Sequence, residues 1–170
     1  MILRNFALQV STLMKIKLIA IGKTDEKYLE EGIEKYLKRL KHYTPFELIV
    51  IPDIKQGGKF TPEKLKEEEG KLILQKVQEG DQLVLLDEKG KNFSSQEFAV
   101  FLQKKQNTVN SNLIFVIGGP FGFSPAVYQR ANEQISLSRL TFSHQMVRLF
   151  FTEQLYRGFT ILRGEKYHHE

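Results

Sequence analysis

Cysteine is absent from this chain of 170 residues. Its absence excludes a disulfide framework, a thiolate nucleophile, and zinc or iron–sulfur sites built on cysteine. Long apolar runs are also missing, since no stretch approaches the roughly 20 residues that a membrane-spanning helix needs. We therefore do not expect a membrane protein. A chain without disulfides is compatible with the cytoplasm, and a cytoplasmic location is the expectation.

Two common phosphate-binding fingerprints are missing as well. The chain contains neither the G-x-G-x-x-G pattern of dinucleotide-binding folds nor the full G-x-x-x-x-G-K-[ST] pattern of a P-loop. Residues 118–122 read GGPFG, which by itself is more typical of a turn than of a ligand cradle. The histidines have no fourth ligand of suitable type and spacing for zinc, so we expect no bound metal.

Positive charge is in excess, with a net charge of +5 and a pI near 9.3, which suits a polyanionic partner. The last 41 residues hold five of the seven arginines but one of the eighteen lysines. Arginine, rather than lysine, makes bidentate contacts with phosphates and stacks on bases. We therefore interpret the C-terminal end as the functional end. Its arginines and histidines are Arg130, Arg139, Arg148, Arg157, Arg163, His144, His168 and His169.

Hydrophobic periodicity predicts strands alternating with helices. The expected strands lie at residues 15–21, 46–51, 82–86 and 113–117, and around 135–137. The expected helices lie at residues 25–41, 61–80 and 145–157, after the capping-box sequence SSQE at 94–97, and after Ser124-Pro125. This alternation is typical of one α/β domain with a mainly parallel sheet flanked by helices.

The first thirteen residues need a separate interpretation. They form a weakly apolar stretch, but Gln9, Ser11 and Thr12 interrupt it and no small-residue cleavage site follows, so a signal peptide is disfavoured. The first strand pattern begins just after Met14. We therefore expect residues 1–13 to be a dispensable N-terminal extension and residues 14–170 to form a single domain.

Three loops follow predicted strands and meet at one place. They comprise residues 86–91, 118–122 and 136–141. Ligands of open α/β sheets bind outside the carboxyl ends of the strands, because parallel strands end at the same edge. The sequence therefore predicts a ligand site formed by these loops.

The last predicted helix is apolar around most of its circumference. Such a helix is buried either in the core or against another subunit, and we expect it to contribute to a homodimer interface. Glu153 and Arg157 have the i,i+4 spacing of a helical ion pair. An internal ion pair and a snorkelling Arg148 explain these charges as well as a functional role does, and both interpretations stay open.

Five motifs follow one another along the chain: LDEKGK at 86–91, FVIGGPFG at 115–122, SLSRLTFSHQMVR at 136–148, EQLYR at 153–157 and YHHE at 167–170. In this order and spacing they resemble the ribosomal RNA large-subunit methyltransferase H family, SPOUT-class enzymes that methylate N3 of a pseudouridine in 23S rRNA. The resemblance runs from Met14 to Glu170. It departs from the family pattern at His169, where arginine or lysine is common.

The resemblance implies a SPOUT-type α/β trefoil knot, a homodimer and S-adenosylmethionine as methyl donor. It implies a cofactor site formed by Leu86, Gly118, Gly119, Ser138, Arg139, Leu140, Thr141, Phe142 and Ser143. It implies RNA contacts from Arg148 and Arg157, and we add Arg163 beside the tail. It implies active-site positions at Glu153 and at the tail residues Tyr167, His168, His169 and Glu170. No metal is required.

Methylation of N3 requires that the base lose its N3 proton. We expect His168 to accept it, with Tyr167, His169 and Glu170 as alternates. A lone histidine such as His144 is more often hydrogen-bonded and structural than catalytic.

Two rival functions remain open at this point. One is a catalytically silent protein that binds RNA or the ribosome through its basic residues. The other is a SPOUT methyltransferase that acts on transfer RNA. Binding of the cofactor distinguishes the first rival from an enzyme.

Overall fold

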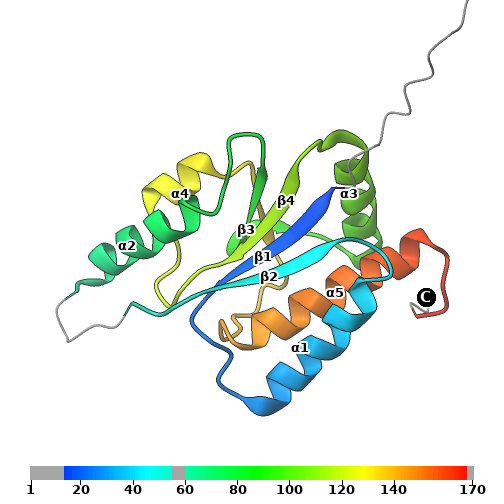
Figure 1. Ribbon diagram of the computed structural model, residues 1–170, viewed down its shortest axis with the longest axis horizontal. Helices are drawn as coiled ribbons and strands as arrows, with labels where there is room; N and C mark the ends of the chain where they lie inside the picture. The colour runs from blue at the N-terminus through cyan, green and yellow to red at the C-terminus, as the bar shows by residue number, and fades with distance from the viewer. Residues whose placement is uncertain (1–13, 55–59, 168–170) are drawn as a thin grey trace, which may run out of the picture.

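A computed structural model describes residues 14–54 and 60–167. Its centre is a five-stranded sheet in the order β2-β1-β4-β3-β5, in which every pairing is parallel (Figure 1). The strands are β1 (Lys15–Ile21), β2 (Phe46–Ile51), β3 (Gln82–Asn92), β4 (Asn112–Ile117) and β5 (Glu133–Ser136). The predicted α/β fold with a parallel sheet is confirmed. The knot stays a prediction.

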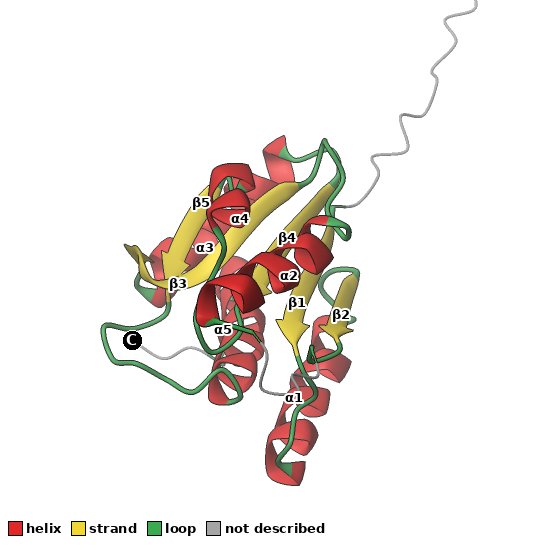
Figure 2. Cartoon of the chain, turned by 90° about the vertical axis from the view of Figure 1, so that its left-hand side faces the viewer, coloured by secondary structure: helices red, strands yellow, loops and turns green. Residues whose placement is uncertain are grey.

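In the part of the chain that the structure describes, five helices cover the two faces of the sheet. They are α1 (Lys27–Leu40), α2 (Pro62–Leu74), α3 (Ser95–Thr108), α4 (Pro125–Arg130) and α5 (Met146–Leu162). Helices α1, α3 and α5 pack on one face, while α2 and α4 pack on the other (Figure 2). Within residues 14–54 and 60–167, no helix has the length and apolarity to cross a membrane.

The central strands bury side chains on both faces. In β4, Leu113 and Phe115 pack toward α3 and α5, whereas Ile114 and Val116 pack toward α2 and α4. In β1, Ile19 is as fully buried as its neighbours on the opposite face. A parallel sheet with helices on both sides has no solvent-facing surface at its centre.

The predicted helix starts are confirmed by their caps. The Thr61 hydroxyl accepts a hydrogen bond from the Lys64 backbone N–H at 3.2 Å. Ser94 and Glu97 form a reciprocal capping box, in which each side chain accepts from the other residue's backbone N–H. These side chains satisfy N–H groups that have no partner inside the helix, so local sequence is sufficient to set the starts.

Three element ends differ from the predictions by five residues or more. Helix α2 ends at Leu74 and not at Gly80. Strand β3 continues past Leu86 because, after a register shift, its last residues pair with β5 again. Helix α5 continues past Arg157 because Gly158 lies against α3, where a Cβ would sit 2.7 Å from Leu102 Cδ1. The last two extensions depend on contacts with distant segments, which periodicity does not register.

Arg148 attaches the start of α5 to the carboxyl end of β1. Its side chain is 1% exposed, and its guanidinium donates to the carbonyl oxygens of Ile21 at 2.6 Å and Gly22 at 2.9 Å. Burial lowers the pKa of Arg148, and the fields of Asp25 and Asp53 oppose that effect. The RNA contact predicted for Arg148 is contradicted by this burial, because its donors point into the protein.

We predict that Arg148→Met destabilises the fold by about 3 kcal/mol, because the buried carbonyl groups of Ile21 and Gly22 lose a charged donor. Urea unfolding at pH 7 measures the change. The matched control is Lys38→Met on the exposed surface of α1, which should change stability by less than about 0.5 kcal/mol. Equal stability of the two variants would contradict the anchoring role.

Candidate functional site

A cavity of about 590 Å³ lies at the carboxyl edge of the sheet. The pairing of β3 with β4 ends with Leu86 opposite Ile117, so β3 separates from β4 at the residue where β4 ends. The loop after β5 closes the third side. The lining residues are 86–89, 117–123, 136–138 and 140–144, with Tyr128 and Val147. The cavity is in the size range of sites that hold a small organic ligand.

The predicted cofactor residues gather around this cavity with one exception. Leu86, Gly118, Gly119, Ser138, Leu140, Thr141, Phe142 and Ser143 line it. Arg139 does not line it. The three loops predicted at the sheet edge thus form one cavity, while a ligand role for the individual residues stays a prediction.

The sequence analysis missed Tyr128 of α4, which lines the cavity. Its hydroxyl donates a hydrogen bond to the Asp87 carboxylate. Burial, together with this bond and the negative charge of Asp87, raises the pKa of Tyr128 to about 12, so the phenol is protonated at neutral pH. Asp87 also accepts from the Lys89 backbone N–H at 2.8 Å, which shapes the turn after Leu86. No local pattern links Tyr128 to Asp87, because 41 residues separate them.

The loop from β5 to α5 is shaped by serine side chains. Ser136 Oγ donates to the Ser138 carbonyl at 2.7 Å, and Ser138 Oγ accepts from the Leu140 N–H at 2.9 Å. Ser143 Oγ accepts from the Met146 N–H at 3.2 Å, at the start of α5. These bonds use side chains to order the backbone of the loop that lines the cavity.

The glycines of the 118–122 loop have a steric role that the sequence analysis did not identify. A Cβ on Gly119 would lie 2.5 Å from Oε2 of Glu69, a residue of α2 that packs behind the loop. A Cβ on Gly118 would lie 3.2 Å from the ring of Phe123. Gly122 has a φ of +80°, a conformation that favours glycine. The loop therefore needs Gly119 for packing against the protein and Gly122 for its backbone conformation.

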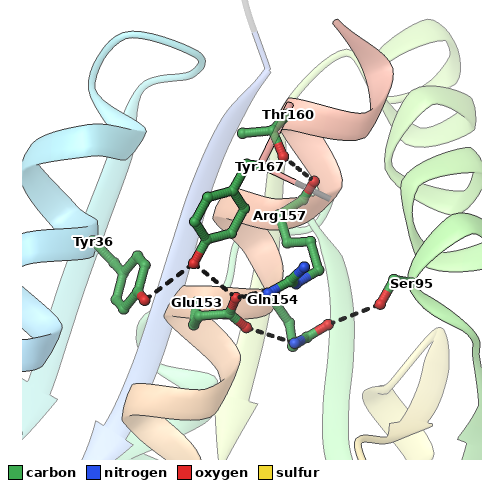
Figure 3. A network of polar contacts seen from close by, with 7 residues as sticks. All are labelled: Tyr36, Ser95, Glu153, Gln154, Arg157, Thr160 and Tyr167. Atoms are coloured by element: carbon green, nitrogen blue, oxygen red, sulfur yellow. Dashed lines mark hydrogen bonds and ion pairs between the residues drawn. The ribbon is translucent and has the colours of Figure 1, made fainter. Parts of the chain in front are cut away.

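A second polar cluster lies farther along α5 (Figure 3). The Glu153 carboxylate accepts from Arg157 at 2.7 Å and from the Tyr167 hydroxyl at 3.1 Å. Gln154 also donates to Glu153 and continues the network to Ser95. The predicted ion pair between Glu153 and Arg157 is confirmed.

Tyr167 is fixed by this cluster. Its hydroxyl lies 3.2 Å from the hydroxyl of Tyr36, and the Arg157 guanidinium lies 4.8 Å from the centre of its ring. Burial, Tyr36 and the negative charge of Glu153 raise the pKa of Tyr167 far above its ordinary value. A phenol that stays protonated is a poor proton acceptor, which argues against Tyr167 as the base.

The remaining predicted site residues lie elsewhere. Arg163 is exposed, donates to the His42 carbonyl oxygen at 3.0 Å and stacks on Tyr43 at 4.2 Å. His168, His169 and Glu170 lie outside the described residues. His144, treated above as a structural histidine, lines the cavity. In the described ranges, no three histidine, aspartate or glutamate side chains gather in a way that would hold a metal ion.

The cavity and the second cluster occupy different parts of α5. Val147 lines the cavity, and Glu153 lies six residues farther along the helix, roughly 9 Å at 1.5 Å per residue. The cavity and the cluster around Glu153 thus share helix α5 but are separate sites.

Known proteins are similar to this chain over most of its length. The family described as "Predicted SPOUT methyltransferase" matches residues 14–168. A protein of Parabacteroides distasonis named ribosomal RNA large subunit methyltransferase H is 59% identical over 157 residues, which cover 92% of this chain and all of the relative. Proteins of the same name from Cytophaga hutchinsonii and Bacteroides thetaiotaomicron are 60% and 52% identical, with the same 92% of this chain and all of each relative covered. The chain belongs to the SPOUT methyltransferase family.

Proposed function

We propose that this protein transfers a methyl group from S-adenosylmethionine to N3 of a pseudouridine in 23S rRNA of the large ribosomal subunit. The observation that carries the proposal is the cavity at the carboxyl edge of the sheet, lined by the loops that match the family's motifs. The names of the relatives, which cover nearly the whole chain, support ribosomal RNA as the substrate.

The cavity fits such a cofactor. Its volume of about 590 Å³ falls in the range of small-molecule sites. Its walls combine apolar side chains, such as Leu86 and Leu137, with the backbone of the glycine loop, a combination suited to an adenine ring and a polar amino-acid chain. When bound, the cofactor supplies a methyl group on a positively charged sulfur, which makes that carbon electrophilic.

The protein contributes to the reaction by aligning the reacting atoms and by accepting a proton. The cavity must hold N3 of the base in line with the methyl carbon, because alignment supplies much of the rate in a displacement reaction. The N3 proton needs an acceptor, and His168 is the first candidate, with His169 and Glu170 as alternates. Glu153 and Arg157 act by holding Tyr167, the first residue of this tail. Arg163 is exposed and available to a phosphate.

A homodimer is part of the proposal. Apolar side chains are exposed next to the cavity: Leu140 at 72%, Phe121 at 52% and Phe150 at 37%. Phe150 packs on Phe142 of the cavity wall, with 4.8 Å between ring centres. An exposed apolar patch of this kind is typical of a subunit interface. A dimer formed through it would place a second subunit beside the cavity entrance.

The first prediction concerns the cavity. Thr141→Trp places a large ring in the cavity from an exposed loop position, so it should weaken binding of S-adenosylmethionine by about tenfold or more without unfolding the protein. Titration calorimetry measures binding, and methyl incorporation into 23S rRNA of ribosomes that lack the modification measures activity. Thr108→Trp, on α3 away from the cavity, is the control. Folded wild-type protein that binds no S-adenosylmethionine would favour the catalytically silent RNA-binding protein.

The second prediction concerns the tail. Deletion of Tyr167 to Glu170 should abolish methyl transfer to ribosomes and leave affinity for S-adenosylmethionine nearly unchanged, because Tyr167 does not line the cavity. His168→Ala should lower the rate roughly 10²- to 10⁴-fold if it accepts the N3 proton. Tyr167→Phe, which keeps the ring under Arg157, is the milder control. Full activity of the deleted protein would exclude the tail from catalysis, and methylation of transfer RNA alone would favour the other rival.

The third prediction concerns the dimer. Phe150→Asp should shift the protein toward monomer in light scattering, because it puts a charge on the proposed interface. Val100→Asp, at a 64% exposed position on α3, is the matched control and should stay dimeric. Phe151→Asp is not a usable test, because Phe151 is fully buried against Phe115 and its loss would unfold the subunit. A folded wild-type monomer at micromolar concentration would refute the dimer.

A further inference from the structure

Glu69 is a buried carboxyl group behind the cavity. It lies on α2 and is 4% exposed. Among residues 14–54 and 60–167, no hydrogen bond or ion pair to its carboxyl group is formed, and only burial and the charge of Asp53 act on it. Buried carboxyl groups are usually paired, since burial without a partner costs free energy in the charged form. An unpaired one beside a ligand cavity calls for a functional explanation.

The carboxyl group lies against Gly119 of the cavity wall and does not itself line the cavity. Both of its oxygens lie within 2.7 Å of the place that a Cβ on Gly119 would occupy. Gly119 in turn lines the cavity. The backbone of one glycine is therefore the layer between Glu69 and whatever the cavity holds. Low-polarity protein, not bulk water, fills the space through which their charges interact.

The groups around Glu69 make its protonation state sensitive to a charge in the cavity. Burial, and then the negative field of Asp53 from the segment after β2, raise the pKa of Glu69 to about 7. Its neighbour in the 118–122 loop is Gly119, which carries no charge, and the uncharged Ser124 before α4 lies against Gly70, the next residue of α2. Arg148 of α5 interacts with Asp53. At neutral pH the carboxyl group is thus close to half protonated, and a positive charge in the cavity favours loss of the proton.

We propose that Glu69 is a positioning residue whose charge follows that of the bound ligand. It releases its proton to solvent when the cationic methyl donor binds. It takes up a proton when the neutral product forms. The inference rests on the proposed function for its ligand. In the reaction the bond between sulfur and the methyl carbon breaks, its electron pair stays on sulfur, and the sulfur loses its positive charge. A carboxylate behind Gly119 therefore favours the donor over the product.

The experiment is titration calorimetry of the whole protein at pH 7 in phosphate and in Tris, two buffers with different heats of ionisation. S-adenosylmethionine and S-adenosylhomocysteine are the ligands, and the difference between buffers counts protons. Binding of the methylated donor should release up to about half a proton per site more than binding of the product, since a group with a pKa near 7 is half protonated at this pH. Between pH 6 and pH 8 the ratio of donor to product affinity should rise about threefold or more, because deprotonated Glu69 favours the cation.

Variants distinguish the effect of the charge of Glu69 from the effect of its shape. Glu69→Gln keeps the shape of the side chain and should abolish both the extra proton release and the pH dependence of the affinity ratio. Glu68→Gln, one residue away, is the control and should behave as wild type, because Lys71 and Lys64 hold the pKa of Glu68 below its ordinary value. Asp53→Asn removes the neighbouring negative charge and should move the proton release to lower pH.

Each outcome is decisive. Wild-type protein that binds both ligands with equal proton counts would overturn the role of Glu69, as would Glu69→Gln with unchanged proton release. Because the wild-type comparison needs no variant, misfolding of Glu69→Gln leaves the test intact. Absence of binding to either ligand would instead refute the proposed function itself.

Discussion

The parallel pairing of β3 with β4 is the constraint on which the site depends. Leu86 and Ile117 lie opposite one another at the end of this pairing, so the segments that follow them start at the same edge. The loop after β5 reaches the same edge because β5 pairs with β3. Parallel strands need helical crossovers, and these cover both faces of the sheet. The loops at the carboxyl edge remain to form the cavity, which is why residues distant in the sequence line one pocket.

Helix α5 joins the two parts of the molecule that we connect with function. Its first residues line the cavity, and its middle carries Glu153 and Arg157, which hold Tyr167. Arg148 ties the helix to the end of β1 through backbone carbonyl groups. A rigid helix fixed at its start by a buried guanidinium maintains the spacing between the cavity and the tail. Arg148 is therefore an organising residue of the site although it faces no ligand.

Glycines in the 118–122 loop connect the cavity to the layer behind it. Gly119 is needed because Glu69 occupies the space where a side chain would point. A ligand-binding loop that packs directly on a titratable group transmits charge as well as shape. The wall of the cavity therefore has a titratable group directly behind it.

The sequence by itself determined the fold class, the order of the elements, the helix caps and the three loops of the cavity, because each depends on local periodicity, capping or strand ends. The ion pair of Glu153 and Arg157 was also predictable, since it joins adjacent turns of one helix. Only the tertiary structure decided the burial of Arg148, the contact of Tyr128 with Asp87, and the position of Glu69 behind Gly119. These features join residues far apart in the chain, and their energies depend on packing and desolvation, which no local pattern encodes.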